Sequence, residues 1–311
     1  MNPAARHRLA LAMLWLVPAL WSSNYVIARA SADAIAPHLL ALARWALALA
    51  LMLPFTWRAL VQGWPQWRGE WRRMLVLGAL GMWICGAFVY IGARSTNAAN
   101  IGLIYAATPV AIAICGAWLL HEPVGLAQRW GMALALAGVL FVIAKGHPAD
   151  LLRLHLSAGD GWIVVAAVAW VAYSVLLQRW PSALPPASRL AAITAGGVAV
   201  LLPFTLIEAL TTPVLVPQPG KAALLVLLAG VLPGVIAYQA YSFLLRELGT
   251  ARTVLLLYLA PLYGAFAAWI TLGEPPQWYH AVGAAVILPS IYLATRRLPN
   301  HDRRAEASAR S

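Results

Sequence analysis

The sequence has few charged residues. Only 10% of its 311 residues are Asp, Glu, Lys or Arg, whereas roughly a quarter of the residues in an ordinary soluble domain are charged. At the same time, 62% of the residues are hydrophobic. A soluble chain of this length could not bury that much apolar surface, so the composition excludes a soluble domain and predicts a protein solvated by lipid.

Acidic side chains are absent from the middle of the apolar runs. All ten acids and all seven histidines lie in connections, at expected helix ends or in the C-terminal tail. Ionisable groups deep in a membrane mark ion and proton pathways, so their absence argues against a proton antiporter built on a carboxylate relay and favours facilitated, gradient-driven movement. It also disfavours a membrane enzyme for lipid phosphates, which needs carboxylate pairs for Mg²⁺. We expect no cofactor and no metal.

Cysteine is nearly absent as well. Cys85 and Cys115 lie inside apolar runs without CxxC spacing, so we interpret them as small packing residues that say nothing about the redox compartment. The net charge of +12 could suggest nucleic acid. However, the basic residues lie between apolar runs and form no patch interleaved with aromatic residues, so the expected macromolecular partner is membrane lipid and not nucleic acid.

Long apolar runs are what the sequence does contain. A helix needs about 20 mostly apolar residues to cross the hydrocarbon core of a bilayer. Ten windows qualify, namely 9–28, 38–57, 74–93, 99–120, 126–144, 160–178, 188–209, 222–244, 252–272 and 278–295. The sequence therefore predicts an all-α integral membrane protein with ten transmembrane helices joined by short connections.

The distribution of Lys and Arg predicts the orientation. With the N-terminus inside, 16 of the 22 basic residues lie on the inner side and five on the outer side, and Arg44 lies inside a helix. The positive-inside rule then predicts that both termini lie in the cytoplasm, with a polar cytoplasmic tail over 298–311. A cleaved signal peptide is the alternative for the first apolar run, because Ala28-Arg29-Ala30 resembles a cleavage site.

The second half of the chain repeats the first at a shift of 152 residues. ATPVAIAICGAWLLHEPVGLAQRWG aligns with LAPLYGAFAAWITLGEPPQWYHAVG, which places Pro109, Glu122, Pro123 and Gly131 on Pro261, Glu274, Pro275 and Gly283. The same shift places Ser22 on Ser174 and Gly78 on Gly230. Five helices per repeat is an odd number, so the repeats 1–145 and 155–297 must be inverted, an arrangement typical of secondary transporters. The alternative is a duplicated scaffold without transport.

These elements resemble a known family. The E-P pair after the fourth and ninth windows, with WSSNYV in the first window echoed by WVAYSV in the sixth, resembles the EamA family of the drug/metabolite transporter superfamily. Within that family the chain is most similar to the bacterial YddG-type exporters of aromatic amino acids. The resemblance covers residues 9–296 and implies ten helices in a 5+5 arrangement, cytoplasmic termini and alternating access around a central cavity.

The candidate substrate-binding residues are mostly polar-aromatic. Aromatic faces stack on apolar or aromatic cargo and attract cations, while hydroxyls and amides fix its orientation. The candidates are Trp21, Ser22, Asn24, Arg44, Tyr90, Tyr105, Trp170, Tyr173, Ser174, Tyr238 and Tyr258. We expect Trp21/Ser22 and Trp170/Tyr173 to face each other where the repeats meet. For each aromatic residue the alternative is packing or an interfacial position, and Arg44 either binds a substrate carboxylate or snorkels and caps a neighbouring helix.

Two repeated acids receive a structural interpretation. Glu122 and Glu274 directly precede Pro123 and Pro275, where an acid in the first turn of a helix complements the helix dipole. We also expect Gly230 and the Gly131/Ala135/Gly138 row to allow close approach of helices.

The leading functional hypothesis is a monomeric exporter of amino acids, including aromatic ones, and related small metabolites, located in the inner membrane of a bacterium as the resemblance implies. A drug, nucleotide-sugar or sugar-phosphate carrier is the first alternative, although phosphate cargo needs several buried Lys or Arg and only Arg44 is available. A membrane enzyme and a channel or purely structural bundle rank lower, since inverted repeats serve alternating access.

Overall fold

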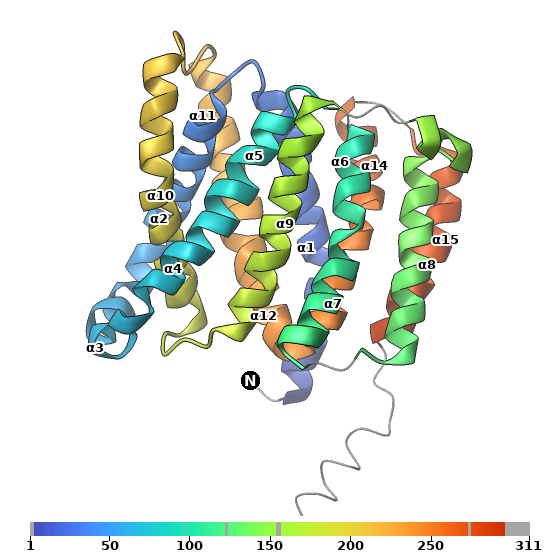
Figure 1. Ribbon diagram of the computed structural model, residues 1–311, viewed down its shortest axis with the longest axis horizontal. Coiled ribbons are helices and arrows are strands. Elements are labelled where there is room, and N and C mark those ends of the chain that lie inside the picture. Colours follow the sequence, from blue (N-terminus) through green and yellow to red (C-terminus); the bar gives the residue numbers. More distant parts are fainter. Residues whose placement is uncertain (1–2, 97, 122–123, 154–156, 273–274, 296–311) are drawn as a thin grey trace, which may run out of the picture.

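The computed structural model describes residues 3–96, 98–121, 124–153, 157–272 and 275–295, and every regular element in this part of the chain is helical (Figure 1). The elements are α1 (Pro3–Ser31), α2 (Pro37–Gln62), α3 (Trp64–Trp67), η1 (Arg68–Glu70), α4 (Trp71–Gly78), η2 (Ala79–Ile84), α5 (Cys85–Gly92), α6 (Ala98–Ala106), α7 (Thr108–Leu119), α8 (Leu126–Ile143), η3 (Pro148–Arg153), α9 (Ala158–Arg179), α10 (Pro186–Thr211), α11 (Pro219–Ala229), η4 (Gly230–Ile236), α12 (Ala237–Leu248), α13 (Thr250–Thr253), η5 (Val254–Leu259), α14 (Ala260–Leu272) and α15 (Trp278–Thr295).

Eight helical stretches are long and apolar enough to cross a bilayer. They correspond to the first eight predicted windows, and most extend beyond them, as α2 does to Gln62. The ninth and tenth windows contain shorter apolar helices, Val254–Phe266 and Trp278–Leu293. The prediction of a multi-pass, all-helical membrane protein is confirmed. Glu122, Glu274 and the tail over 298–311 lie outside the described residues, so the expectations for them stay predictions.

The long helices run between two ends of the bundle. We call the end at which α1 begins and α15 ends the terminal face, and the opposite end the distal face (Figure 1). α1 starts at the terminal face, whereas α9, which follows it by the repeat shift, starts at the distal face. The two corresponding helices are therefore antiparallel.

Helix interruptions recur at corresponding positions. The third of the eight long stretches, Trp64–Gly92, contains the π-helical segment η2 (Ala79–Ile84). The eighth, Pro219–Leu248, contains the π-helical segment η4 (Gly230–Ile236), and the two segments overlap when shifted by 152 residues. Pro233 lies inside the second segment and cannot donate an intrahelical hydrogen bond. The helix also breaks before Pro109, whereas Pro18 lies within the continuous helix α1. Only some of the interior prolines therefore interrupt the backbone, and such interruptions are frequent at functional sites.

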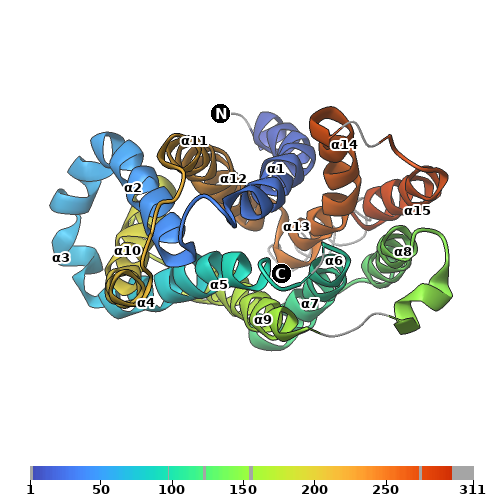
Figure 2. The ribbon, with the colours of Figure 1, turned by 90° about the horizontal axis from the view of Figure 1, so that it is seen from above.

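The contacts between helices follow the same correspondence. α1 packs on α12 and α14, and its counterpart α9 packs on α5 and α7. α4 packs on α10, and the corresponding α11 and η4 pack on α2. Two further pairs, α2 with α10 and α8 with α15, join corresponding helices to each other (Figure 2).

Glycines allow several of these crossings. A Cβ on Gly78 would lie 2.3 Å from the Gly197 backbone nitrogen of α10, and one on Gly230 would lie 3.0 Å from the Arg44 carbonyl oxygen of α2. A Cβ on Gly138 would lie 2.8 Å from a side-chain carbon of Ile287 in α15. Small residues let the backbones approach closely in a membrane. The predicted packing roles of Gly138 and Gly230 are confirmed.

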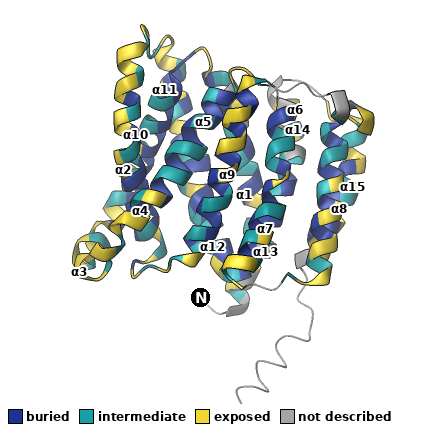
Figure 3. Ribbon diagram, viewed as in Figure 1, coloured by how far each residue is buried: buried dark blue, intermediate teal, exposed yellow. Residues whose placement is uncertain are grey.

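Burial separates the core of the bundle from its lipid-facing surface. Buried residues are frequent on α5, α9 and α12 in the centre, while the second half of α10 exposes apolar side chains outward (Figure 3). Phe55 is 89% exposed and Leu210 is 88% exposed, as expected where lipid is the solvent.

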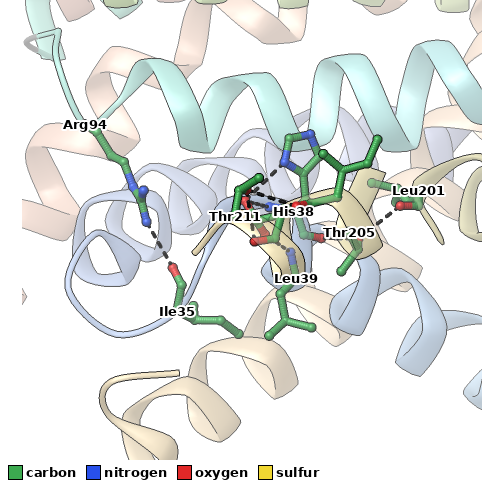
Figure 4. Close-up of polar contacts among 9 residues, drawn as sticks. Ile35, His38, Leu39, Arg94, Leu201, Thr205 and Thr211 are labelled. Carbon is green, nitrogen blue, oxygen red and sulfur yellow. Dashed lines mark hydrogen bonds and ion pairs between the residues drawn. The ribbon is translucent and has the colours of Figure 1, made fainter. Parts of the chain in front are cut away.

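The N-terminus of α2 is capped by an acid from α10. The residue before α2 is Ala36, which has no side chain to cap the helix. Glu208 instead accepts hydrogen bonds from the backbone N–H groups of His38 (3.1 Å) and Leu39 (2.9 Å), and its Oε1 lies 3.2 Å from the His38 Nδ1 (Figure 4). The first N–H groups of a helix have no intrahelical partner, so Glu208 satisfies two of them and complements the helix dipole.

Candidate functional site

Five aromatic side chains meet in the centre of the bundle. Trp21 of α1 contacts Trp170 of α9 edge-on, with ring centroids 5.1 Å apart. Trp170 stacks on Tyr173 at 5.5 Å. The repeat shift carries Trp21 onto Tyr173, and both of these rings contact Trp170. We call Trp21, Trp170, Tyr173, Tyr238 and Tyr241 the aromatic cluster.

Tyr238 and Tyr241 of α12 complete the aromatic cluster. The ring centroid of Tyr241 lies 5.1 Å from those of both Trp21 and Trp170. The ring centroid of Tyr238 lies 5.8 Å from those of both Trp170 and Tyr173. The cluster is almost closed to the outside, since Tyr173 and Tyr241 are fully buried and only Trp21 is partly accessible. In this conformation the aromatic side chains occupy the centre themselves.

The phenol groups of the aromatic cluster are unequally satisfied. The Tyr241 hydroxyl donates to Ser174 Oγ at 3.0 Å, and the Tyr238 hydroxyl donates to the Gly81 carbonyl oxygen at 3.0 Å. Gly81 lies in the π-helical segment η2. The buried Tyr173 hydroxyl has no hydrogen-bond partner among the described residues. An unpaired buried hydroxyl is costly, so this group is available to a bound polar molecule.

A buried cation lies next to the aromatic cluster. Arg44 is only 3% exposed, about two turns into α2. Its guanidinium donates to Asn24 Oδ1 of α1 at 2.9 Å and to the Tyr90 hydroxyl of α5, and the Tyr90 hydroxyl donates to Asn24 Oδ1 at 2.8 Å. We call Asn24, Arg44 and Tyr90 the arginine triad. The alternative in which Arg44 snorkels to the interface is therefore wrong, because three helices enclose the guanidinium.

No carboxylate among the described residues forms an ion pair with Arg44. The ion pairs found among the described residues join Arg6 to Glu247, His38 to Glu208 and Lys221 to Asp33. Moreover, Arg44 Nε is buried without a hydrogen-bond partner in this part of the structure. A buried charge without a counter-ion is expensive, so the arginine triad is suited to receiving an anionic group.

Trp45 connects the arginine triad to the aromatic cluster. The Arg44 guanidinium carbon lies 4.6 Å from the centroid of the Trp45 ring, a cation–π distance. On its other side, the Trp45 ring lies 4.9 Å from that of Tyr238. A molecule with a negative group and an aromatic or apolar part could therefore contact both sets of residues.

The other predicted residues lie elsewhere. The Ser22 hydroxyl donates to the Ala260 carbonyl oxygen at 3.3 Å, towards α14. The Tyr105 hydroxyl lies 3.8 Å from Cys85 Sγ. Tyr258 belongs to a separate apolar core with residues of α8 and α15, such as Met132 and Ile287. The eleven candidates thus do not form one wall, and Tyr258 packs apart from the aromatic cluster.

Two central residues were missing from the sequence prediction. Tyr241 lies three positions after Tyr238, a spacing that places both on one face of a helix. Trp45 follows Arg44 directly and is fully buried. The helical spacing could have indicated Tyr241, whereas the contact of Trp45 with Tyr238 forms only when α12 packs beside α2.

In the described residues, no group of three or more His, Cys, Asp or Glu could hold a metal ion.

The comparisons with known proteins agree with this architecture. The sequence model described as the EamA-like transporter family matches twice, over residues 8–144 and 157–296. A solved crystal structure superimposes with a TM-score of 0.71, covering 92% of this chain and 97% of the other, at 22% sequence identity. That likeness shows the fold.

Curated relatives are similar over most of their length. An uncharacterized transporter of Archaeoglobus fulgidus is 26% identical over 96% of this chain and 99% of its own. The S-adenosylmethionine/S-adenosylhomocysteine transporter of Chlamydia trachomatis is 23% identical, covering 90% and 87% of the two chains. A probable terminal-alkyne amino-acid exporter of Streptantibioticus cattleyicolor is 30% identical, covering 75% and 76%.

Proposed function

This chain belongs to the EamA-like transporter family and is a multi-pass membrane transporter, and from that premise we propose that it exports amino acids, aromatic ones included, by alternating access. The observation that carries the proposal is that Arg44 is buried beside the aromatic cluster and pairs with no carboxylate of the described residues. Arg44 offers a site for a carboxylate, and the aromatic rings offer one for a side chain.

The proposed architecture is a 5+5 inverted repeat of residues 1–145 and 155–297. It is supported by the antiparallel course of α1 and α9, by the corresponding π-helical segments and by the recurring pairs of helix contacts. In such transporters the substrate lies where the repeats meet, and the repeats rock around it. The aromatic cluster joins both halves, so cargo would enter as α1 and α9 separate.

The proposed orientation places the terminal face in the cytoplasm of a bacterium, with the protein a monomer in the inner membrane. The support is the excess of Lys and Arg on the side of the N-terminus. Both the start of α1 and the end of α15 lie at that face (Figure 1).

Two relatives favour the amino-acid class of cargo. One is named as an exporter of a terminal-alkyne amino acid and the other as a transporter of S-adenosylmethionine, which carries an amino-acid group and an aromatic base. A carboxylate on Arg44 with an unsaturated or aromatic group on Trp21 and Trp170 would suit both kinds of molecule. Sugar-phosphate cargo fits less well, because Arg44 is the only buried Lys or Arg in the described residues.

Counterflow in proteoliposomes tests the carboxylate site. Arg44→Gln should lower tryptophan exchange about 10- to 100-fold, as expected for the loss of hydrogen bonds to a charged group. Tryptamine, which lacks the carboxylate, should lose much less. Arg94→Gln, a change in a basic residue near the distal face, is the control for a general effect of charge. Equal loss of tryptophan and tryptamine in a variant that is folded and monodisperse would contradict the site.

Truncation of one ring tests the aromatic cluster. Trp170→Ala should remove about 1 kcal/mol or more of contact with an aromatic cargo and should therefore reduce tryptophan exchange more than alanine exchange. Trp118→Ala, at a side chain that is 77% exposed on α7, is the matched control. If Trp170→Ala reduces exchange equally across the panel, the cluster packs the bundle and the cargo binds elsewhere.

A further inference from the structure

An open groove lies between α7 and α8, apart from the aromatic cluster and the arginine triad. Its volume is about 790 Å³, within the range of roughly 300–1,000 Å³ that is typical of ligand sites. Its walls are apolar, and they include Ala113, Ile114, Trp118, Met132, Ala133 and Leu136.

The groove opens to the lipid and not to the interior of the bundle. Ile114 and Trp118 at its edge are 63% and 77% exposed, whereas Ala113 and Met132 at its floor are buried. Water is a poor occupant of a recess with so few polar partners. In a bilayer an acyl chain can fill the recess without losing hydrogen bonds.

Arg129 lies at the mouth of the groove, at the terminal face. Its Nε donates to the Val124 carbonyl oxygen at 3.1 Å, which fixes the guanidinium beside the groove. The two terminal nitrogens have no hydrogen-bond partner among the described residues, and the side chain is exposed. A guanidinium binds phosphate oxygens well. His121, the other polar side chain of the lining, is exposed at the same end of the groove.

The repeat-related position lacks this cation. The shift of 152 residues carries Arg129 onto Ala281, near the distal end of α15. The basic mouth is therefore a property of the terminal face alone. Basic pockets between transmembrane helices at a cytoplasmic surface bind anionic lipid headgroups.

From these observations we propose that the α7–α8 groove binds one anionic phospholipid, with an acyl chain between the helices and the headgroup phosphate on Arg129. The proposal stands independently of the cargo, because none of the groove residues named here belongs to the arginine triad or the aromatic cluster.

Native mass spectrometry of the detergent-solubilised protein tests the site. Phosphatidylglycerol and phosphatidylcholine with identical chains are added in turn, and lipid adducts are counted. The unmodified protein should retain phosphatidylglycerol about fivefold better, as expected for one basic residue near an anionic headgroup. Arg129→Gln should abolish the preference and Arg129→Lys should restore much of it. Arg179→Gln, another exposed arginine at the terminal face, should leave it unchanged.

A second variant tests the acyl-chain part of the groove. Ala133→Trp should fill the groove and reduce retention of both lipids, whereas Ala199→Trp, at an exposed alanine of α10, should not. If Ala133→Trp lowers the melting temperature, Ala117→Val provides a milder filling of the same wall. The proposal is overturned if the unmodified protein shows no preference for phosphatidylglycerol, if Arg179→Gln matches Arg129→Gln, or if a folded groove-filling variant retains lipid normally.

Discussion

Two corresponding helix crossings, one at each end of the bundle, are held together by different contacts. At the distal face the start of α9 meets the end of α5 and the start of α6. At the terminal face the start of α1 meets the end of α12. The repeat shift relates α9 to α1 and α5 to α12, so these are two versions of one crossing (Figure 1).

The distal crossing is tightly packed. Asp160 is 4% exposed, and its carboxylate accepts hydrogen bonds from the Thr96 hydroxyl, from Asn100 Nδ2 at 2.8 Å and from the Ser157 backbone N–H at 2.6 Å. Beside it, a Cβ on Gly159 would lie 2.5 Å from the Gly92 carbonyl oxygen. The backbones therefore touch at this crossing.

The terminal crossing is open to solvent. Arg6 of α1 pairs with Glu247 of α12, and their side chains are 48% and 18% exposed. The repeat shift places Leu244 of α12 where the distal crossing has Gly92, so the terminal crossing lacks the glycine that lets the distal backbones touch.

The difference indicates which end opens more easily. Hydrogen bonds to a charged, buried acceptor contribute about 1.5–3 kcal/mol each, whereas an exposed ion pair contributes about 0–1 kcal/mol. Separating the helices should therefore cost less free energy at the terminal face. We infer that this conformation is sealed at the distal face and held weakly at the terminal face.

The largest expected effect is at Gly159. Gly159→Ala places a methyl group against the Gly92 backbone, which cannot rotate away, so the free energy of unfolding should fall by about 3 kcal/mol or more. Gly161→Ala is the matched control, because no atom lies within 4 Å of its added Cβ. Thermal melting in detergent measures both variants. Similar melting temperatures for the two would contradict the tight crossing.

Asp160→Asn should come next. The amide keeps the size of the side chain but replaces one acceptor oxygen with a donor, which then faces Thr96 or Asn100. We expect a loss of about 2 kcal/mol in the free energy of unfolding, measured by thermal melting in detergent. Unchanged melting would mean that the Asp160 contacts do not hold the distal end closed.

Arg6→Gln should have a smaller effect. The pair with Glu247 is exposed and screened by salt, so we expect a loss of at most about 1 kcal/mol that disappears at high ionic strength. The exchanged pair Arg6→Glu with Glu247→Arg should recover the melting temperature. A loss as large as that of Asp160→Asn would remove the contrast between the two ends.

The smallest effect is expected for the exposed pair of Asp33 and Lys221 at the distal face. The hydrogen bond from Lys221 Nζ, 2.8 Å long, lowers the pKa of Asp33 below its ordinary value of 3.8. Any contribution to stability is therefore present above that ordinary value and is lost as the pH falls through the lowered pKa. We expect Asp33→Asn to leave the melting temperature unchanged near neutral pH. A clear drop would mean that the side of the membrane, and not burial, distinguishes the two crossings.

The sequence carried strong information about the helices and little about their faces. Apolar length located the long helices, and the repeat pointed to corresponding positions such as Gly78 and Gly230. It also directed attention to Trp21 and Trp170, which meet in the structure. The sequence did not distinguish Tyr258 from the residues of the aromatic cluster, because its neighbours in the sequence are equally apolar. In the structure Tyr258 belongs to the core of α8 and α15.

The amino-acid sequence by itself determined that this protein lies in a membrane, roughly where its helices run and which of them correspond. The tertiary structure alone decided that Arg44 is enclosed by Asn24 and Tyr90, and that Trp45 connects it to the aromatic cluster. The physical reason is that lipid and protein interior are both apolar. A helix in water reveals its buried face by the contrast between polar and apolar residues, whereas here both faces read alike until the helices pack.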